Sequence, residues 1–110
     1  MKEITYADFE KIEIQIGTVV EAVRAKNIHK PAYRLLIDFG AAGIKKSSAQ
    51  ITERYTAEEL LGMQVTAVVN FPAKQIGKFI SECLVLGALD DEGVTLLTVS
   101  KKSENGNRVA

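Results

Sequence analysis

The sequence predicts a small all-β protein, and three observations support this fold class. Apolar and polar residues alternate over residues 12–16, which is typical of a strand with one buried face. Further short apolar runs end at glycine, proline or paired acidic residues, which mark turns. The segment "TAEELLGM", residues 56–63, is the one good helix signal.

Length and composition are those of one globular domain. The chain has 110 residues, of which 46% are apolar and 25% are charged. Its apolar runs are far shorter than the roughly 20 residues that cross a bilayer, and "MKEITYADFEK" at the N-terminus has no apolar leader segment. We therefore expect one domain over residues 1–110, a cytoplasmic location and no membrane insertion.

The first predicted strand follows a single helical turn that Asp8 caps. Gly17 marks a change of phase within this strand, which predicts a bulge or a sharp coil. Pro31 lies in a loop, "KNIHKPAYR", because proline cannot donate a ladder hydrogen bond. Six strands are expected in all: residues 11–23, 33–39, 44–51, 64–71, 81–89 and 94–99.

The predicted helix lies between the third and fourth strands. Thr56 and Glu59 have the spacing of a capping box, and Gly62 suits the position just past the helix end. A five- to six-stranded Greek-key barrel with one short helix between strands 3 and 4 is the OB-fold. That fold binds ligands through its second and third strands and through loops L12 and L45.

Basic residues gather in the segments that this fold uses for binding. L12 corresponds to residues 26–34 and L45 to residues 72–79, "PAKQIGKF". Residues 24–50 carry six lysines and arginines against Asp38 alone, although the net charge of the chain is zero. Such segregation can form a basic face, unless folding mixes the charges again. The candidate cations are Lys30, Arg34, Lys45, Lys46, Lys74 and Lys78.

Two phenylalanines and a glutamine extend the candidate site. Phe71 and Phe79 flank L45, where they could anchor an apolar peptide side chain or stack on a base. Either ring could instead close an end of the barrel. Gln50 could bind a peptide backbone or a base edge, or it could simply end a strand.

The residues indicate no catalytic chemistry. His29 is the only histidine and has no carboxylate near it in the sequence. Cys83 is the only cysteine and lies in an apolar run, so burial should raise its pKa and make it unreactive. Glycine signatures for phosphate or dinucleotide binding are missing. We expect no enzymatic activity, no metal site and no cofactor.

Five segments of the chain carry a family resemblance: "DFEKIEIQIGTVVEA", "IDFG", "IKKSSAQITERY", "LLGMQVTAVVNFP" and "FISECLVLGA". Together they resemble the tRNA-binding-domain family, and within it the CsaA-like protein-export chaperones. The resemblance implies an OB-fold homodimer whose N- and C-terminal segments help to form the interface. It also implies binding of unfolded or presecretory polypeptides, in concert with the export machinery, whereas other members bind tRNA.

One loop distinguishes the two branches of this family. The tRNA-binding branch carries Asn-Leu-x-x-x-Lys-x-Arg-Gly followed by a serine. Asn70 and Ser81 fit that pattern, and Lys74 and Gly77 fit it when the count is shifted by one residue, since direct counting puts Lys78 at the glycine. Ile76 stands where the arginine would be, which removes a bidentate phosphate ligand. We therefore expect a CsaA-like chaperone, with structure-specific tRNA binding at the same surface as the alternative.

Overall fold

The computed structural model describes residues 1–25 and 30–110. Residues 26–29, which include His29 and the start of the predicted L12 loop, lie outside the described residues. The helical elements are α1 (Tyr6–Glu10), the 3₁₀ turn η1 (Gly40–Ala42) and α2 (Ala57–Leu60). The strands are β1 (Ile14–Arg24), β2 (Tyr33–Asp38), β3 (Ile44–Ala49), β4 (Gln64–Val68), β5 (Lys74–Ile76), β6 (Phe79–Ser81), β7 (Leu84–Val85), β8 (Gly87–Asp90) and β9 (Gly93–Leu96).

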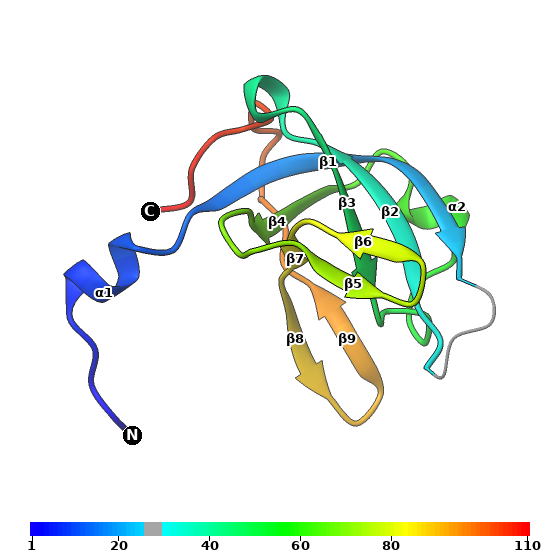
Figure 1. The fold of residues 1–110 in the computed structure, drawn as a ribbon, viewed down its shortest axis with the longest axis horizontal. Helices are drawn as coiled ribbons and strands as arrows, with labels where there is room; N and C mark the ends of the chain where they lie inside the picture. Colours follow the sequence, from blue (N-terminus) through cyan, green and yellow to red (C-terminus); the bar gives the residue numbers. More distant parts are fainter. Residues whose placement is uncertain (26–29) are drawn as a thin grey trace.

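A curved five-stranded sheet in the order β3-β2-β1-β4-β7 forms the barrel (Figure 1). All neighbouring strands are antiparallel, and β1 pairs with β4 through its first half and with β2 through its second. The backbone N–H of Glu82 donates to the carbonyl of Lys46 at 2.7 Å, so the segment before β7 reaches the far edge at β3. The sheet is nearly closed, and the predicted OB-type barrel is confirmed.

The bend in β1 does not fall where the sequence predicts it. The register against β2 shifts between Val19 and Glu21, three residues beyond Gly17. Gly17 serves another purpose, because a Cβ there would lie 2.6 Å from Ile37 Cγ2 and 2.8 Å from the Phe39 ring. The glycine leaves room for the side chains of Ile37 and Phe39 inside the barrel. Gly17 is therefore required for this close packing and does not mark the bulge.

The barrel interior is apolar, and α2 closes one side of it. The Thr56 side chain accepts from the backbone of Glu59, and the Glu59 carboxylate accepts from the backbone of Thr56, which confirms the predicted capping box. Leu60 is fully buried, and Gly62 has φ +85°, the left-handed conformation that glycine adopts without strain. The largest fully buried side chains are Phe39, Leu35, Ile37, Leu60, Val19 and Val65.

The predicted fifth strand, residues 81–89, is divided among β6, β7 and β8. At Leu86 the backbone changes partners, because its N–H donates to Thr66 of β4 while its carbonyl accepts from Leu97. Gly87 then packs so closely on Val94 that a Cβ would overlap that side chain. The apolar run "CLVLGAL" carries no local mark of this change, which depends on segments that are distant in the sequence.

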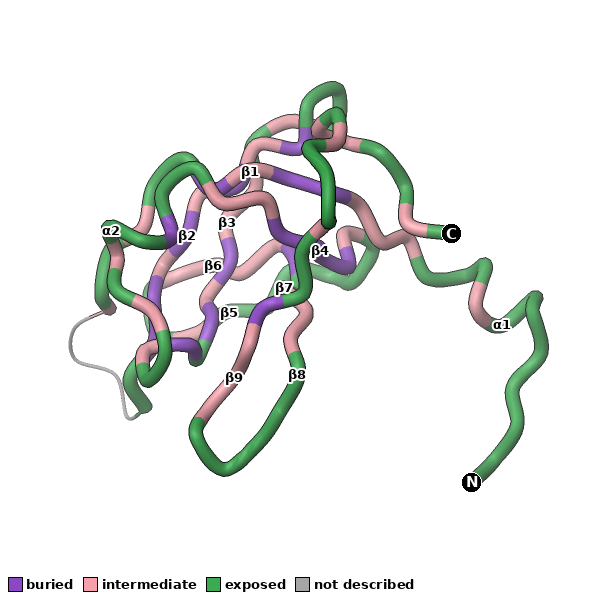
Figure 2. Tube along the Cα trace, turned by 180° about the vertical axis from the view of Figure 1, so that it is seen from behind, coloured by how far each residue is buried: buried purple, intermediate pink, exposed green. Residues whose placement is uncertain are grey.

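Beyond the barrel, β8 and β9 form a two-stranded hairpin that projects from the body (Figure 1). Its turn is the predicted "DDEG", with Gly93 at φ +118°. Strand β9 ends at Leu96, whereas the sequence predicts a last strand that continues to residue 99. Figure 2 shows that buried residues concentrate on the barrel strands, whereas β8 and α1 are exposed almost throughout.

The C-terminal tail and the end of α1 lie next to the start of β1. The cap of α1 is Thr5, and Asp8 is the third residue of the helix, where it completes the capping box, so the predicted cap position was wrong. The C-terminal tail, predicted only to be polar, extends the sheet, because Gly106 N–H donates to Ile16 and Val109 N–H donates to Ile14. No residue of α1 is buried.

Candidate functional site

A hairpin lies within and beyond the predicted L45 loop, and hydrogen bonds tie it to the edge of the barrel. Strand β5 pairs with β6, and Ser81 Oγ accepts from the backbone N–H of Ser48 at 3.2 Å. Glu82 forms hydrogen bonds with both backbone groups of Lys46. Its carboxylate accepts from the Lys46 N–H at 2.9 Å, and its own backbone N–H donates to the Lys46 carbonyl. These bonds place the hairpin at a defined position against β3.

The hairpin brings Phe79 over two cations of the sheet. Arg34 Cζ lies 5.2 Å and Lys46 Nζ 5.7 Å from the centre of the phenyl ring. Both distances are those of cation–π contacts. Tyr33 and Leu35, the neighbours of Arg34, are buried in the core, so the alternation of β2 directs Arg34 to the outer face. The ring of Phe79 therefore lies on the outside of the barrel.

Lys45 and Lys46 are adjacent in β3, so their side chains point to opposite faces of the strand. Lys45 pairs with Ile37, which is fully buried, and its charge acts on the thiol of Cys83. Of the two lysines, Lys46 is the one that joins Arg34 and Phe79. The predicted group of cations is therefore divided between two faces.

Cys83 is buried beneath this edge of the barrel, with 6% of its surface exposed. Burial raises its pKa from 9.0 to about 11, and the hydrogen bond with Ser47 and the charge of Lys45 only partly oppose that rise. The prediction of a buried core thiol is confirmed. The group is protonated at neutral pH, which makes it a poor nucleophile.

An apolar groove of about 840 Å³ lies next to this hairpin. Four predicted site residues line it: Gln50, Phe71, Lys74 and Ser81. Phe79 and its two cations are not among its lining residues. Its other lining residues are Ser48, Ala49, Ile51, Pro72, Ile76, Glu82, Cys83, Leu84, Val85, Leu86, Gly87, Leu89 and Val94.

Three large apolar side chains at this groove are exposed to solvent. Phe71 is 54%, Leu84 48% and Leu89 84% exposed. The sequence indicates Phe71 as a site residue but not Leu84 or Leu89, because both leucines lie in an apolar run that is typical of a buried strand. Exposed apolar surface that lines a groove is typical of a docking site.

The remaining predicted residues lie apart from the groove. The side-chain amide of Asn70 joins two backbone groups, accepting from Glu13 N–H at 2.9 Å and donating to the Lys11 carbonyl at 2.7 Å. Asn70 therefore fastens the start of the first strand to the end of β4. Lys30 and Lys78 are exposed. Neither lysine forms an ion pair with any carboxylate in residues 1–25 and 30–110.

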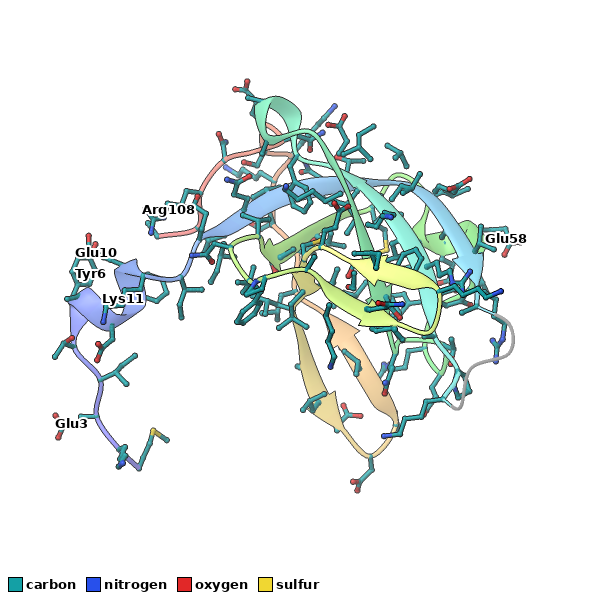
Figure 3. All side chains as sticks on the ribbon, viewed as in Figure 1. Glu3, Tyr6, Glu10, Lys11, Glu58 and Arg108 are labelled. Carbon is teal, nitrogen blue, oxygen red and sulfur yellow. The ribbon has the colours of Figure 1, made fainter. Side chains whose placement is uncertain are left out.

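The N-terminal arm, residues 1–12, stands away from the barrel (Figure 3). Arg108 of the tail holds its base, donating to the Glu10 carbonyl at 2.8 Å and pairing with Glu13 at 3.4 Å. Further out, Ile4 and Tyr6 are exposed. Sequence analysis did not identify Arg108, because nothing in the polar tail marks it as a contact.

Residues 1–25 and 30–110 contain no group of three or more His, Cys, Asp or Glu that could hold a metal ion. Over the same residues, no helix is both long and apolar enough to cross a membrane.

Comparison with solved structures supports the same architecture. The chaperone CsaA from Bacillus anthracis str. Ames has a TM-score of 0.94 at 44% identity, covering 99% of this chain and 100% of that one. The CsaA chaperone protein from Picrophilus torridus has a TM-score of 0.93 at 51% identity, covering 98% and 100%.

Curated proteins that are similar to this chain include enzymes that are several times longer than it. The methionine–tRNA ligase of Methanocella arvoryzae is 37% identical over 106 residues, which is 96% of this chain but 15% of that protein. The chain thus spans about a sixth or less of such a relative, which matches it only over this appended domain. Residues 14–108 match the family model described as "Putative tRNA binding domain", which is not a catalytic domain. This chain therefore belongs to the tRNA-binding-domain family.

Proposed function

We propose that this protein is a CsaA-like molecular chaperone, not an enzyme, that binds unfolded or presecretory polypeptides for protein export in the cytoplasm. The observation that carries the proposal is the apolar groove of about 840 Å³ with Phe71, Leu84 and Leu89 exposed around it. The likeness to two CsaA structures supports it. The proposal treats residues 1–110 as one OB-fold domain.

The groove suits an extended polypeptide because of its lining. Apolar side chains of a client would leave water together with those of the groove, which is favourable and needs no particular sequence. Gln50 and Ser81 add polar groups that can bond to a peptide backbone. Lys74 and Glu82 supply one charge of each sign; Lys74 is exposed at the rim, where a charge adds little affinity, and Glu82 is half-buried.

The proposed chaperone is a homodimer, and the N-terminal arm supports this part of the proposal. Residues Tyr6–Glu10 form a capped helix that buries none of its residues. A five-residue helix is not stable alone in water, so its order requires contacts from elsewhere. A second copy of the chain, in contact with Ile4 and Tyr6, would supply them.

We infer tRNA binding as the second candidate function, on one observation. Arg34 and Lys46 converge on Phe79 on the outer face of the barrel, and neither is paired with a carboxylate in residues 1–25 and 30–110. Unpaired cations on this face suit the phosphates of a folded RNA. The family description supports this candidate as well.

Salt dependence separates the two candidates. The pure protein would be titrated with a labelled unfolded precursor polypeptide and with labelled tRNA, at about 50 and 200 mM salt. We expect client affinity to change less than about twofold, because apolar contacts are not screened. Affinity for tRNA should fall by at least about tenfold, because each phosphate contact releases counterions.

Two outcomes would change this ranking. A client affinity that collapses with salt, beside tight and saturable tRNA binding, would make tRNA binding the main function. If neither ligand binds at the lower salt concentration, both candidate functions are wrong.

A further inference from the structure

We propose that Arg34, Lys46 and Phe79 form a phosphate-binding site for RNA, in which Phe79 is a positioning residue that holds the two cations together. This inference deepens the second candidate function and rests on it. Sequence analysis treats Phe79 as a surface for a base or an apolar side chain. The structure gives its ring two cationic neighbours, at 5.2 and 5.7 Å from its centre.

Neither Arg34 nor Lys46 forms an ion pair in the part of the chain that the structure describes. No carboxylate in residues 1–25 and 30–110 lies within the 4.0 Å of a salt bridge from Arg34 or Lys46. Glu82 is near, but its carboxylate accepts from the backbone N–H of Lys46 rather than from its ammonium group. Like charges that converge repel each other, and an anion bound between them would remove that repulsion.

The backbone next to Phe79 is held against β3, whereas long cationic side chains are flexible. Phe79 is two residues from Ser81, whose hydroxyl bonds to β3, and the next residue, Glu82, bonds to both backbone groups of Lys46. Free lysine and arginine side chains sample many rotamers and lose that freedom when they bind. A ring in contact with both side chains reduces the conformational entropy that they lose on binding, since their positions are already restricted.

The surroundings favour a chain of phosphates over a single carboxylate. Lys30 and Lys78 are exposed and form no ion pair within residues 1–25 and 30–110. Lys30 lies four residues before Arg34 in the sequence, and Lys78 directly precedes Phe79. Repeated unpaired cations match a polymer that carries one charge per nucleotide. The planar guanidinium of Arg34 can bind two phosphate oxygens at once.

Phe79 variants test the positioning role, with unfractionated tRNA as the probe. We expect Phe79→Leu, which keeps an apolar side chain but removes the ring, to weaken tRNA binding about three- to tenfold, because a cation–π contact is lost from each cation. Phe79→Tyr keeps the ring, so its affinity for tRNA should stay within about twofold of that of the natural protein. Equal affinities for the two variants would overturn the positioning role, as long as thermal unfolding shows both to be folded.

Adjacent lysines provide a matched control that does not alter Phe79. We expect Arg34→Gln and Lys46→Gln each to reduce the slope of log affinity against log salt by about 0.7–0.9, the value for one phosphate contact. Lys45→Gln removes the same charge from the other face of β3 and should change the slope by less than half of that. Equal effects of Lys45→Gln and Lys46→Gln would place the site elsewhere, even if Phe79 variants fail to fold.

A second polyanion identifies the ligand class. Poly-L-glutamate carries carboxylates instead of phosphates, and we expect it to bind more weakly than tRNA and to respond little to Phe79→Leu. The same affinity and the same response would assign the site to acidic polypeptides and overturn the RNA assignment. If the natural protein does not bind tRNA, the inference and the second candidate function both fail, while client binding at the groove is unaffected. If tRNA binds but all Phe79 variants behave alike, only the positioning role fails.

Discussion

Phe71 and Phe79 are alike in the sequence, since each flanks a basic loop, but their surroundings in the structure differ. Phe71 follows β4 and lies exposed at the apolar groove, whereas Phe79 contacts Arg34 and Lys46. A ring already in contact with two cations offers less free surface to an apolar client. At the residue scale, Phe71 is therefore the aromatic side chain to test for polypeptide binding.

We expect Phe71→Ala to weaken binding of an unfolded client about five- to thirtyfold, because burying the remaining exposed part of a phenylalanine is worth about 1–2 kcal/mol. Global stability should change little, since more than half of this side chain is in water. Fluorescence titration with a labelled client and thermal unfolding would measure the two effects.

Leu61→Ala is the matched control for this prediction. Leu61 is 52% exposed, close to the 54% of Phe71, but it is not among the residues that line the groove. Its truncation should leave client affinity within about twofold. If both substitutions weaken binding equally, the groove is not the site of contact.

At the scale of elements, the chain contains two capping boxes of the same design in different settings. Thr5 and Asp8 cap α1, which buries no residue, while Thr56 and Glu59 cap α2, which buries Leu60 in the core. The local hydrogen bonds are equivalent. The contribution of each box to the stability of the barrel depends on whether its helix packs on anything.

We expect Thr56→Ala to lower the free energy of unfolding by about 1 kcal/mol, the usual cost of losing a threonine cap. Thr5→Ala should change the free energy of unfolding of the barrel by less than about 0.3 kcal/mol, because α1 packs on no core residue. Urea titrations of the two variants would give both values. Equal losses would mean that α1 is coupled to the barrel more tightly than its exposure indicates.

At the scale of the whole molecule, the N-terminal arm and the C-terminal tail lie together outside the barrel. Arg108 joins them through Glu10 and Glu13, so an extended arm is held at its base and free at its tip (Figure 3). Exposed Ile4 and Tyr6 near that tip are the apolar surface that the proposed dimer would cover.

We expect a variant that lacks residues 1–10 to be a monomer with a folded barrel, because the deletion leaves every core residue in place. Light scattering after size exclusion would measure its mass, and circular dichroism its strands. Lys2→Gln is the matched control, since it changes the charge of the arm and leaves Ile4 and Tyr6. A truncated protein that still dimerises would place the interface elsewhere.

Those features of this protein that depend on neighbours along the chain could be predicted from its amino-acid sequence. Alternation located the first strand, the Thr56–Glu59 spacing identified a capping box, and "DDEG" marked a turn. These signals are local because a strand face, a cap and a turn each involve residues that are only a few positions apart. The order of such elements was enough to predict the barrel.

The contacts between distant segments could not be predicted in this way and are seen in the folded barrel alone. The tertiary structure divided residues 81–89 among three strands, placed Phe79 against Arg34 and Lys46, and laid the tail along β1. It also left Leu89 exposed at the groove, although its run reads as a buried strand. Each of these results depends on contacts between segments that are far apart in sequence, and the closure of the barrel, rather than any local pattern, selects those contacts.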